Sequence, residues 1–246
     1  MSLQGHRVVV VGGSSGLGAA AAERFARDGA EVVVVGRDGA RTEAVAGRIG
    51  ARAEVVDLRD PGAVQGLFAR LGPIDDLVVT VTGRDGAGPF ATLDLAALRR
   101  GIEDKVLTQL AIVQAALPTL AERGSITLIT AASARAALPG TVGLAAINGA
   151  LEAAVRPLAA ELAPRRVNAI SPGVVATAWW DGFGDAAREA VFAQARETLP
   201  VGRVGTPEEL GDLIVAVAGA AFMTGAVVPC DGGLSLATGA RMPSRV

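Results

Sequence analysis

Short runs of β-branched residues alternate with longer helical segments along the whole chain, and this alternation constrains the fold more than any other feature. Runs such as Val8–Val11 and Val32–Val35 are apolar at every position, which is typical of strands covered on both faces. Strands are predicted at Arg7–Val11, Glu31–Gly36, Arg52–Val56, Leu77–Val81, Ser125–Thr130, Arg166–Ile170 and Ala226–Pro229. Helices are predicted between them at Leu17–Asp28, Arg41–Gly50, Pro61–Leu71, Leu95–Leu120, Ala145–Leu162 and Pro207–Ala220.

This order of elements predicts an α/β fold, a doubly wound parallel sheet with helices on both faces. The 246 residues suit one domain, and no linker or repeat divides them. We therefore expect residues 1–246 to form a single domain. An irregular segment, residues 174–205, interrupts the alternation with Trp179, Trp180 and Phe183 and then a helical stretch at Ala186–Thr198. Such excursions are often lids or substrate-binding segments, although a surface elaboration would have the same pattern.

Composition excludes several classes of function. The 23 basic and 25 acidic residues nearly balance, which gives no reason to expect nucleic acid or an anionic membrane as a partner. Cys230 and His6 are each the single residue of their type, so we expect no metal site and no Ser-His-Asp triad. The N-terminus lacks the pattern of a signal peptide, and no apolar run is long enough to span a bilayer. A cytoplasmic protein is the expectation.

A glycine-rich loop, Val11-Gly12-Gly13-Ser14-Ser15-Gly16-Leu17-Gly18, connects the first predicted strand to the first predicted helix. Its glycines allow a tight turn and a close approach of backbone N–H groups to a pyrophosphate, and the helix N-terminus favours negative charge. A second strand follows at the proper distance, so the loop predicts a dinucleotide site rather than a structural turn. The predicted contacts are Gly12, Ser14, Ser15, Gly16, Leu17 and Gly18.

The end of the second predicted strand indicates which dinucleotide binds. A site specific for NAD carries Asp or Glu there, whereas Gly36 leaves room and Arg37 can pair with a 2′-phosphate. Asp38 opposes that charge, and Arg37 is also compatible with a solvated side chain. We expect NADP(H) to be preferred over NAD(H).

With these motifs in order, the chain resembles a short-chain dehydrogenase/reductase over nearly its whole length. The phosphate loop is similar to the family's TGxxxGxG, with Val11 in place of threonine, and Arg166–Gly173 is similar to the run that leads to the nicotinamide. Asp57-Leu58, Met223-Thr224-Gly225 and Asp231-Gly232-Gly233 complete the resemblance. It implies a Rossmann-type domain with further cofactor contacts at Asp57, Leu58, Pro172, Gly173, Val175 and Thr177. It also implies contacts at Thr82 and Gly83, although Thr80-Val81-Thr82-Gly83 replaces the family's NNAG.

The residues that such a family uses for catalysis are missing, since the chain contains no tyrosine. The family's mechanism employs a tyrosine acid or base, a lysine four residues later and a serine that polarises the substrate. Aligned on Gly149–Glu152 and Glu161–Pro164, the chain has Leu144 for the tyrosine, Asn148 for the lysine and Ala131 for the serine. A shift of two residues offers Ser133 instead of Ala131, and no shift restores a tyrosine or a lysine in this helix.

Lys105, the single lysine of the chain, stands where the family has a helix asparagine. An ammonium near the nicotinamide could polarise an oxygen or donate a proton if burial lowers its pKa. A surface lysine paired with Asp104 or Glu103 is equally compatible with the sequence. Lys105 and Ser133 are the candidate catalytic residues, and Lys105 and Asn148 are also candidate cofactor contacts.

Three functions remain open from the sequence. The first is an NADP(H)-dependent oxidoreductase that acts on a small carbonyl, imine or alcohol, with Lys105, Ser133 or water handling the proton. The second is a cofactor-binding sensor or scaffold without hydride transfer, and the third is a non-redox catalyst that retains the pocket. The helices predicted at Leu95–Leu120 and Ala145–Leu162 correspond to those the family uses for assembly, which implies a homodimer or homotetramer.

Overall fold

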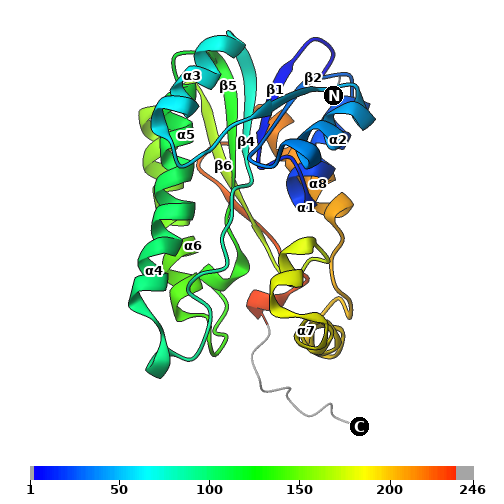
Figure 1. Cartoon of the computed structure of the whole chain (residues 1–246), viewed down its shortest axis with the longest axis vertical. Helices are drawn as coiled ribbons and strands as arrows, with labels where there is room; N and C mark the ends of the chain where they lie inside the picture. The colour runs from blue at the N-terminus through cyan, green and yellow to red at the C-terminus, as the bar shows by residue number, and fades with distance from the viewer. Residues whose placement is uncertain (1–2, 237–246) are drawn as a thin grey trace.

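A parallel sheet of seven strands forms the middle layer of the computed structural model, which describes residues 3–236 (Figure 1). Its strands lie in the order β3-β2-β1-β4-β5-β6-β7, so the predicted doubly wound α/β fold is confirmed. The strand bounds are β1 Arg7–Val11, β2 Glu31–Gly36, β3 Arg52–Val55, β4 Ile74–Val79, β5 Leu120–Ile129, β6 Arg166–Pro172 and β7 Val227–Cys230.

Helices cover both faces of this sheet (Figure 1). One face packs against α1 (Gly16–Arg27), α2 (Gly39–Ile49) and α8 (Pro207–Gly219). The other packs against α3 (Pro61–Leu71), α5 (Thr108–Ala116) and α6 (Val142–Glu161). Side chains alternate along β1, where Val8 and Val10 belong to the first core and Val9 and Val11 to the second. This double coverage explains why the strands are apolar at every position.

The predicted helix at Leu95–Leu120 is wrong, because the segment consists of several elements. It begins with α4 (Leu95–Gly101), continues as the π-helix Ile102–Leu107 and ends with α5. The hydroxyl of Thr108 donates to the carbonyl of Glu103 beside this widened turn. Pro118 then excludes further helix, and Leu120 already pairs with Ile74 in the sheet.

The start of β4 also lies outside its predicted range, since the strand begins at Ile74 rather than Leu77. The acidic pair Asp75-Asp76 obscures it in the sequence. Asp76 is buried nonetheless, and its carboxylate accepts hydrogen bonds from the hydroxyl of Ser125 and from the imidazole of His6. Buried polar groups need such partners, and they arise only when β1, β4 and β5 lie side by side.

The remaining described elements extend the fold at the carboxyl ends of the strands. A 3₁₀ turn at Ala178–Phe183 and α7 (Asp185–Thr198) follow β6 and lie beyond the helical layers (Figure 1). Shorter 3₁₀ turns are Phe90–Thr92, Ala132–Ala134 and Leu234–Leu236. Within residues 3–236, no helix combines the length and apolar character needed to cross a membrane.

Packing of α8 on α1 generates a stability prediction. Gly211 of α8 lies so close to α1 that a Cβ there would be 2.9 Å from the backbone of Ala20. We expect Gly211→Ala to lower the free energy of unfolding by about 1–3 kcal/mol, because the two helices must move apart. Gly47→Ala in α2 is the matched control, with no atom within 4 Å of the new methyl group. That control should stabilise the protein by up to about 1 kcal/mol through helix propensity. Urea denaturation measures both, and stabilisation by Gly211→Ala would contradict the packing argument.

Candidate functional site

The phosphate loop between β1 and α1 is held by close backbone contacts. Gly12 has a φ of +85°, and its Cβ would lie 2.5 Å from Oγ1 of Thr80. A Cβ on Gly18 would lie 2.3 Å from the carbonyl oxygen of Gly12. The loop therefore tolerates no side chain at these positions, as its predicted role requires. Ser15 is the N-cap of α1 and makes no side-chain capping bond within the described residues, which leaves helix N–H groups for an anion.

The end of β2 lies directly beside this loop. A Cβ on Gly36 would meet Oγ1 of Thr42 at 2.4 Å and the side chain of Ser14 at 3.0 Å, so a carboxylate side chain does not fit there. The side chain of Asp38 accepts hydrogen bonds from the guanidinium of Arg41 at 2.7 Å and from its backbone N–H at 3.1 Å. These bonds lower the pKa of Asp38. The guanidinium of Arg37 is exposed and has no hydrogen bond or ion pair within residues 3–236.

The predicted adenine contacts follow β3. They lie at the carboxyl edge of the sheet, beside the region between the phosphate loop and the segments after β4 and β6, which we call the crevice. The backbone N–H of Val56 donates to the carbonyl of Gly36, so Asp57 and Leu58 come next to the end of β2. Asp57 is exposed, and Leu58 packs partly against the core. Arg59 donates to Asp104 at 2.6 Å, which connects this loop to the π-helix.

The turn after β6 approaches the phosphate loop from the other side. A Cβ on Gly173 would be 2.6 Å from the backbone of Asp231, so the Pro172-Gly173 turn packs tightly on the C-terminal Asp-Gly-Gly motif. Val175 is buried and pairs with Gly205. A Cβ built on Gly16 would lie 3.5 Å from the side chain of Thr177. The predicted pyrophosphate contacts of the two segments are therefore neighbours in space.

Residues after β4 form the opposite border of the crevice. The hydroxyl of Thr80 donates to the carbonyl of Val11 at 3.0 Å, which joins β4 to β1. The buried amide of Gln109 donates to the carbonyls of Val81 at 2.9 Å and Ile129 at 3.1 Å. Gln109 was missed in the sequence, where Gln114 of the same helix gives an equal signal and only burial distinguishes the two. Thr82 is exposed, and Gly83 is half-buried beside it.

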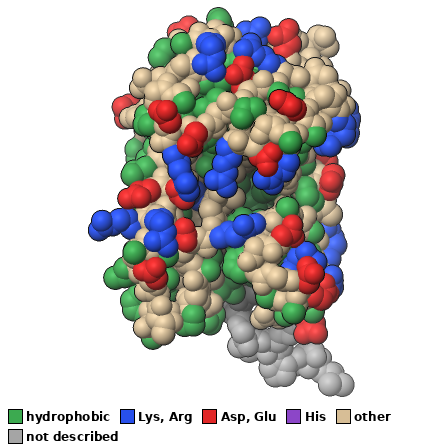
Figure 2. Space-filling model, viewed as in Figure 1, with side chains coloured by type: hydrophobic (Ala, Val, Ile, Leu, Met, Phe, Trp, Pro, Cys, Tyr) green, Lys and Arg blue, Asp and Glu red, His purple; other side chains and the backbone are tan. Residues whose placement is uncertain are grey.

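Two reciprocal contacts join this border to the segment after β6. The indole Nε1 of Trp179 donates to the carbonyl of Gly83 at 2.9 Å. In return, the guanidinium of Arg84 donates to the carbonyls of Trp179 at 2.8 Å and Ala178 at 3.1 Å. Trp180 packs edge-on against Phe192 of α7. These contacts join the segment after β6 to the residues after β4. Figure 2 shows basic side chains, with acidic ones between them, across the middle of the face in view.

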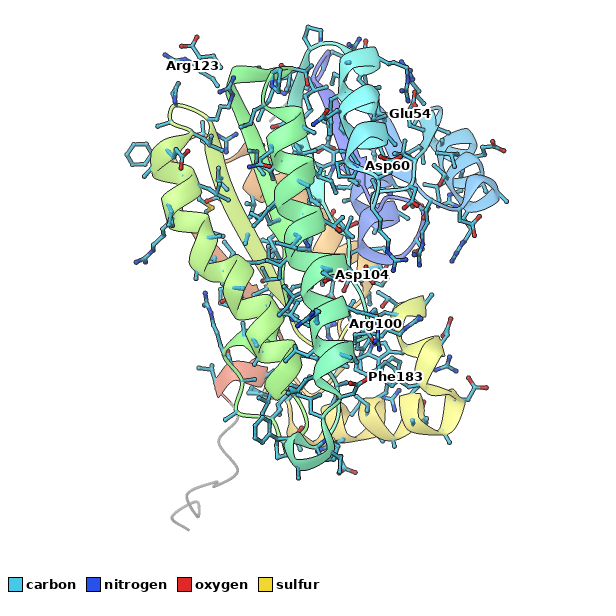
Figure 3. All side chains as sticks on the ribbon, turned by 60° about the vertical axis from the view of Figure 1, so that its left-hand side comes forward. Glu54, Asp60, Arg100, Asp104, Arg123 and Phe183 are labelled. Carbon is cyan, nitrogen blue, oxygen red and sulfur yellow. The ribbon has the colours of Figure 1, made fainter. Side chains whose placement is uncertain are left out.

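Lys105 lies inside the site, so the alternative of a surface lysine paired with Asp104 or Glu103 is wrong. Only 5% of Lys105 is exposed, and its Nζ donates to Oδ1 of Asn148 at 2.7 Å and to the carbonyl of Thr130 at 3.3 Å. Burial lowers its pKa from 10.5 to about 8, and the charge of Glu152 opposes that shift. Figure 3 shows the neighbouring Asp104 on the π-helix Ile102–Leu107, and Asp104 accepts a hydrogen bond from Arg59.

Asn148 connects Lys105 to the second candidate residue. Its Nδ2 donates to Oγ of Ser133 at 3.1 Å and to the carbonyl of Leu144 at 2.9 Å. The hydroxyl oxygen of Ser133 is therefore an acceptor in this network, and its own proton is available to a substrate oxygen. Leu144, which the sequence predicts at the position of the family's tyrosine, offers no polar group. Ala131 likewise offers none, which leaves Ser133 as the hydroxyl that reaches the network.

The side chains at this site do not form a cluster of metal ligands. Among residues 3–236, no group of three or more His, Cys, Asp and Glu side chains is placed to hold a metal ion. Around Lys105 the site instead combines the buried ammonium, the amide of Asn148 and the hydroxyl of Ser133. Such groups bind and polarise an oxygen atom.

Comparison with known proteins gives consistent matches over most of the chain. A family model described as Enoyl-(Acyl carrier protein) reductase matches residues 11–235. The short-chain dehydrogenase/reductase ATR9 of Stachybotrys chlorohalonatus is 31% identical over 96% of this chain and 99% of its own. The inactive 2-(S)-hydroxypropyl-CoM dehydrogenase 2 of Xanthobacter autotrophicus is 32% identical over 85% and 96%. A small-chain dehydrogenase solved in complex with NADPH has a TM-score of 0.84 and 31% identity, covering 95% of this chain and all of its own.

Because Lys105 is buried, the free energy of unfolding should vary with pH in the alkaline range. Below about pH 8 the folded and unfolded chains both hold the Lys105 proton; above it the folded chain releases the proton, while the unfolded chain keeps it up to about 10.5. The unfolded state then binds more protons, so the contribution of Lys105 to the free energy of unfolding rises with pH in this window. The rise is up to about 1.4 kcal/mol per pH unit. Denaturation at pH 7 to 10 of the wild type and Lys105→Met measures it, and parallel pH curves for the two proteins would contradict it.

Proposed function

The chain belongs to the short-chain dehydrogenase/reductase family, and from this premise we propose that it is an NADP(H)-dependent oxidoreductase whose proton donor is not a tyrosine. The observation that carries the proposal is the buried network of Lys105, Asn148 and Ser133. Lysine and asparagine have exchanged the positions that the family gives them. The site therefore retains an ammonium and an amide in direct contact, although the tyrosine is absent.

The crevice fits a dinucleotide at several independent points. The glycine loop leaves backbone donors open for the pyrophosphate, with Thr177 beside it. Arg37 has no partner within the described residues, and Gly36 excludes the carboxylate that would repel a 2′-phosphate. Asp57 and Leu58 would contact the adenine, whereas Pro172, Gly173 and Val175 would border the nicotinamide. When bound there, NADP(H) supplies or accepts a hydride.

The chain's own residues would handle the substrate oxygen or nitrogen. Ser133 donates its hydroxyl proton in a hydrogen bond to that atom, because its oxygen already accepts from Asn148. The ammonium of Lys105 supplies positive charge behind this pair. In the reduction, the substrate atom would take the hydroxyl proton of Ser133, and solvent would return a proton to Ser133. A small carbonyl or imine is reduced in one direction, and an alcohol is oxidised in the other. General acid–base assistance contributes about 10²–10⁴-fold, so loss of the tyrosine leaves the effect of positioning intact.

A second candidate function is a cofactor-binding sensor or scaffold without hydride transfer. Leu144 favours it, because an apolar side chain occupies the position of the family's acid. The name of one relative describes that protein as inactive. The two functions differ in turnover and not in cofactor binding. We also propose assembly as a homodimer or homotetramer through α5 and α6, as the family resemblance implies.

Cofactor preference depends on Arg37. We expect the wild type to bind NADPH at least about tenfold more tightly than NADH, and Arg37→Ala to remove this preference, because a charge-assisted contact contributes about 1.5–3 kcal/mol. Both tryptophans lie in the segment across the crevice, so energy transfer from Trp179 and Trp180 to the reduced nicotinamide measures binding. Arg123→Ala is the control, since Arg123 lies near the amino end of β5 and far from Asp104 and Phe183 in Figure 3, whereas Arg37 follows the carboxyl end of β2. Equal affinities of the wild type for both cofactors would contradict the assignment of Arg37.

Turnover separates the two candidate functions. Stopped-flow loss of NADPH absorbance across panels of carbonyls and imines should show reduction, and the rate should fall as pH rises through about 8, where Lys105 loses its proton. Lys105→Met should lower kcat by about 10²-fold or more, with little change in NADPH affinity. Ser133→Ala should also lower kcat, whereas Asp104→Asn should leave kcat unchanged. Tight NADPH binding without turnover of any substrate would instead favour the sensor or scaffold.

A further inference from the structure

A buried carboxylate that the proposed chemistry does not use lies behind the site. The side chain of Glu152, on α6, is 10% exposed and makes three hydrogen bonds. Its Oε1 accepts from the hydroxyl of Thr130 at 3.1 Å and from the hydroxyl of Ser171 at 2.8 Å. Its Oε2 accepts from Nε of Arg135 at 2.8 Å. Glu152 thereby joins the ends of β5 and β6 to the turn that carries Ser133.

A single residue, Thr130, separates this carboxylate from the Lys105 ammonium. The carbonyl of Thr130 accepts from Lys105, and its hydroxyl donates to Glu152. An isolated buried ammonium is costly, and an opposite charge nearby favours its protonated form. Glu152 is the acid whose charge acts in this direction on Lys105.

The other charged groups around Lys105 are engaged elsewhere or exposed. Asp104 on the same element binds Arg59, and Glu103 is exposed. On the α4 side, Arg100 lies 3.9 Å from Asp85 and 3.8 Å from Asp94. The segment Thr108–Ala116 of α5 has no charged residue, and the guanidinium of Arg84 is bound to the carbonyls of Ala178 and Trp179. Within residues 3–236, the guanidinium of Arg135 is bound to Glu152.

We propose that Glu152 is a positioning residue that holds the Lys105 ammonium in its charged form. Through its hydrogen bonds to Arg135 and Ser171, Glu152 also fixes the turn of Ser133 and the end of β6 beside Lys105. Its carboxylate acts through Thr130 and makes no contact with the reacting atoms. Arg135 opposes it, because the guanidinium neutralises part of the negative charge that Lys105 experiences. The proposal concerns the same site as the proposed function. It concerns the charge state of Lys105, however, which is measurable without a substrate.

The single lysine of the chain provides a direct test. Protein labelled with ¹³C and ¹⁵N only in lysine has one lysine side-chain signal, and its shift against pH reports the titration of Lys105 without assignment. The wild type should titrate at about 8. Glu152→Gln keeps the shape of the side chain and removes its charge, so it should lower the transition by about one pH unit. The matched control Asp104→Asn removes the acid adjacent in sequence and should leave the transition in place.

A second variant increases the negative charge that Lys105 experiences, whereas Glu152→Gln decreases it. Arg135 is 40% exposed, so Arg135→Gln should retain the fold, and it should raise the Lys105 transition by releasing the Glu152 charge. An unchanged transition in folded Glu152→Gln overturns the proposal, as does an equal shift in Asp104→Asn. If Glu152→Gln does not fold, Arg135→Gln tests the proposal alone. The proposal is then overturned if the Lys105 transition of Arg135→Gln does not move to higher pH. None of these results depends on turnover, so an inactive protein with the expected shifts supports the proposal while the proposed oxidoreductase fails.

Discussion

The ammonium of Lys105, buried at the carboxyl ends of the strands, determines how the polar groups of the site are arranged. A buried ammonium requires acceptors, and it has Oδ1 of Asn148 and the carbonyl of Thr130. Because Asn148 accepts from Lys105 through its oxygen, its nitrogen must donate, and Ser133 receives that bond. The direction of each hydrogen bond therefore follows from one positive charge. Glu152 completes the arrangement from the opposite side of Thr130.

Glycine packing brings the binding surfaces of the crevice close to one another. The absence of a Cβ at Gly12 and Gly18 lets the phosphate loop close on itself against Thr80. Gly16 lets the loop approach Thr177, and Gly173 lets the turn after β6 pack on Asp231. The contacts between Arg84, Trp179 and Gly83 then close the outer side of the crevice. A dinucleotide in this crevice would touch segments from both halves of the sheet, at the point where the strand order reverses.

The proposed exchange of lysine and asparagine between two family positions would give the missing tyrosine a structural context. Loss of an acid alone would leave a gap beside an otherwise unchanged site. Here the ammonium is supplied from the π-helix instead of α6, and the amide from α6 instead of the neighbouring helix. The two side chains still meet in one hydrogen bond. This retained pair favours an altered chemistry over a merely damaged site, and it motivates the proposed oxidoreductase over the scaffold.

The sequence by itself determined the fold class, the phosphate loop, the absence of a tyrosine and the family resemblance. These features depend on local patterns, namely the all-apolar strands, the helical periodicity and the glycines at a strand–helix junction. It left the surroundings of Lys105 open and indicated a continuous helix where the chain forms a π-helix and then a strand. Tertiary structure decided that Lys105 meets Asn148 and not Asp104, and that Glu152 and Gln109 form hydrogen bonds with Thr130 and Ile129 beside it. The physical reason is that burial and hydrogen-bond partners depend on residues 20 to 43 positions away, which only the packing of helices on the sheet brings together.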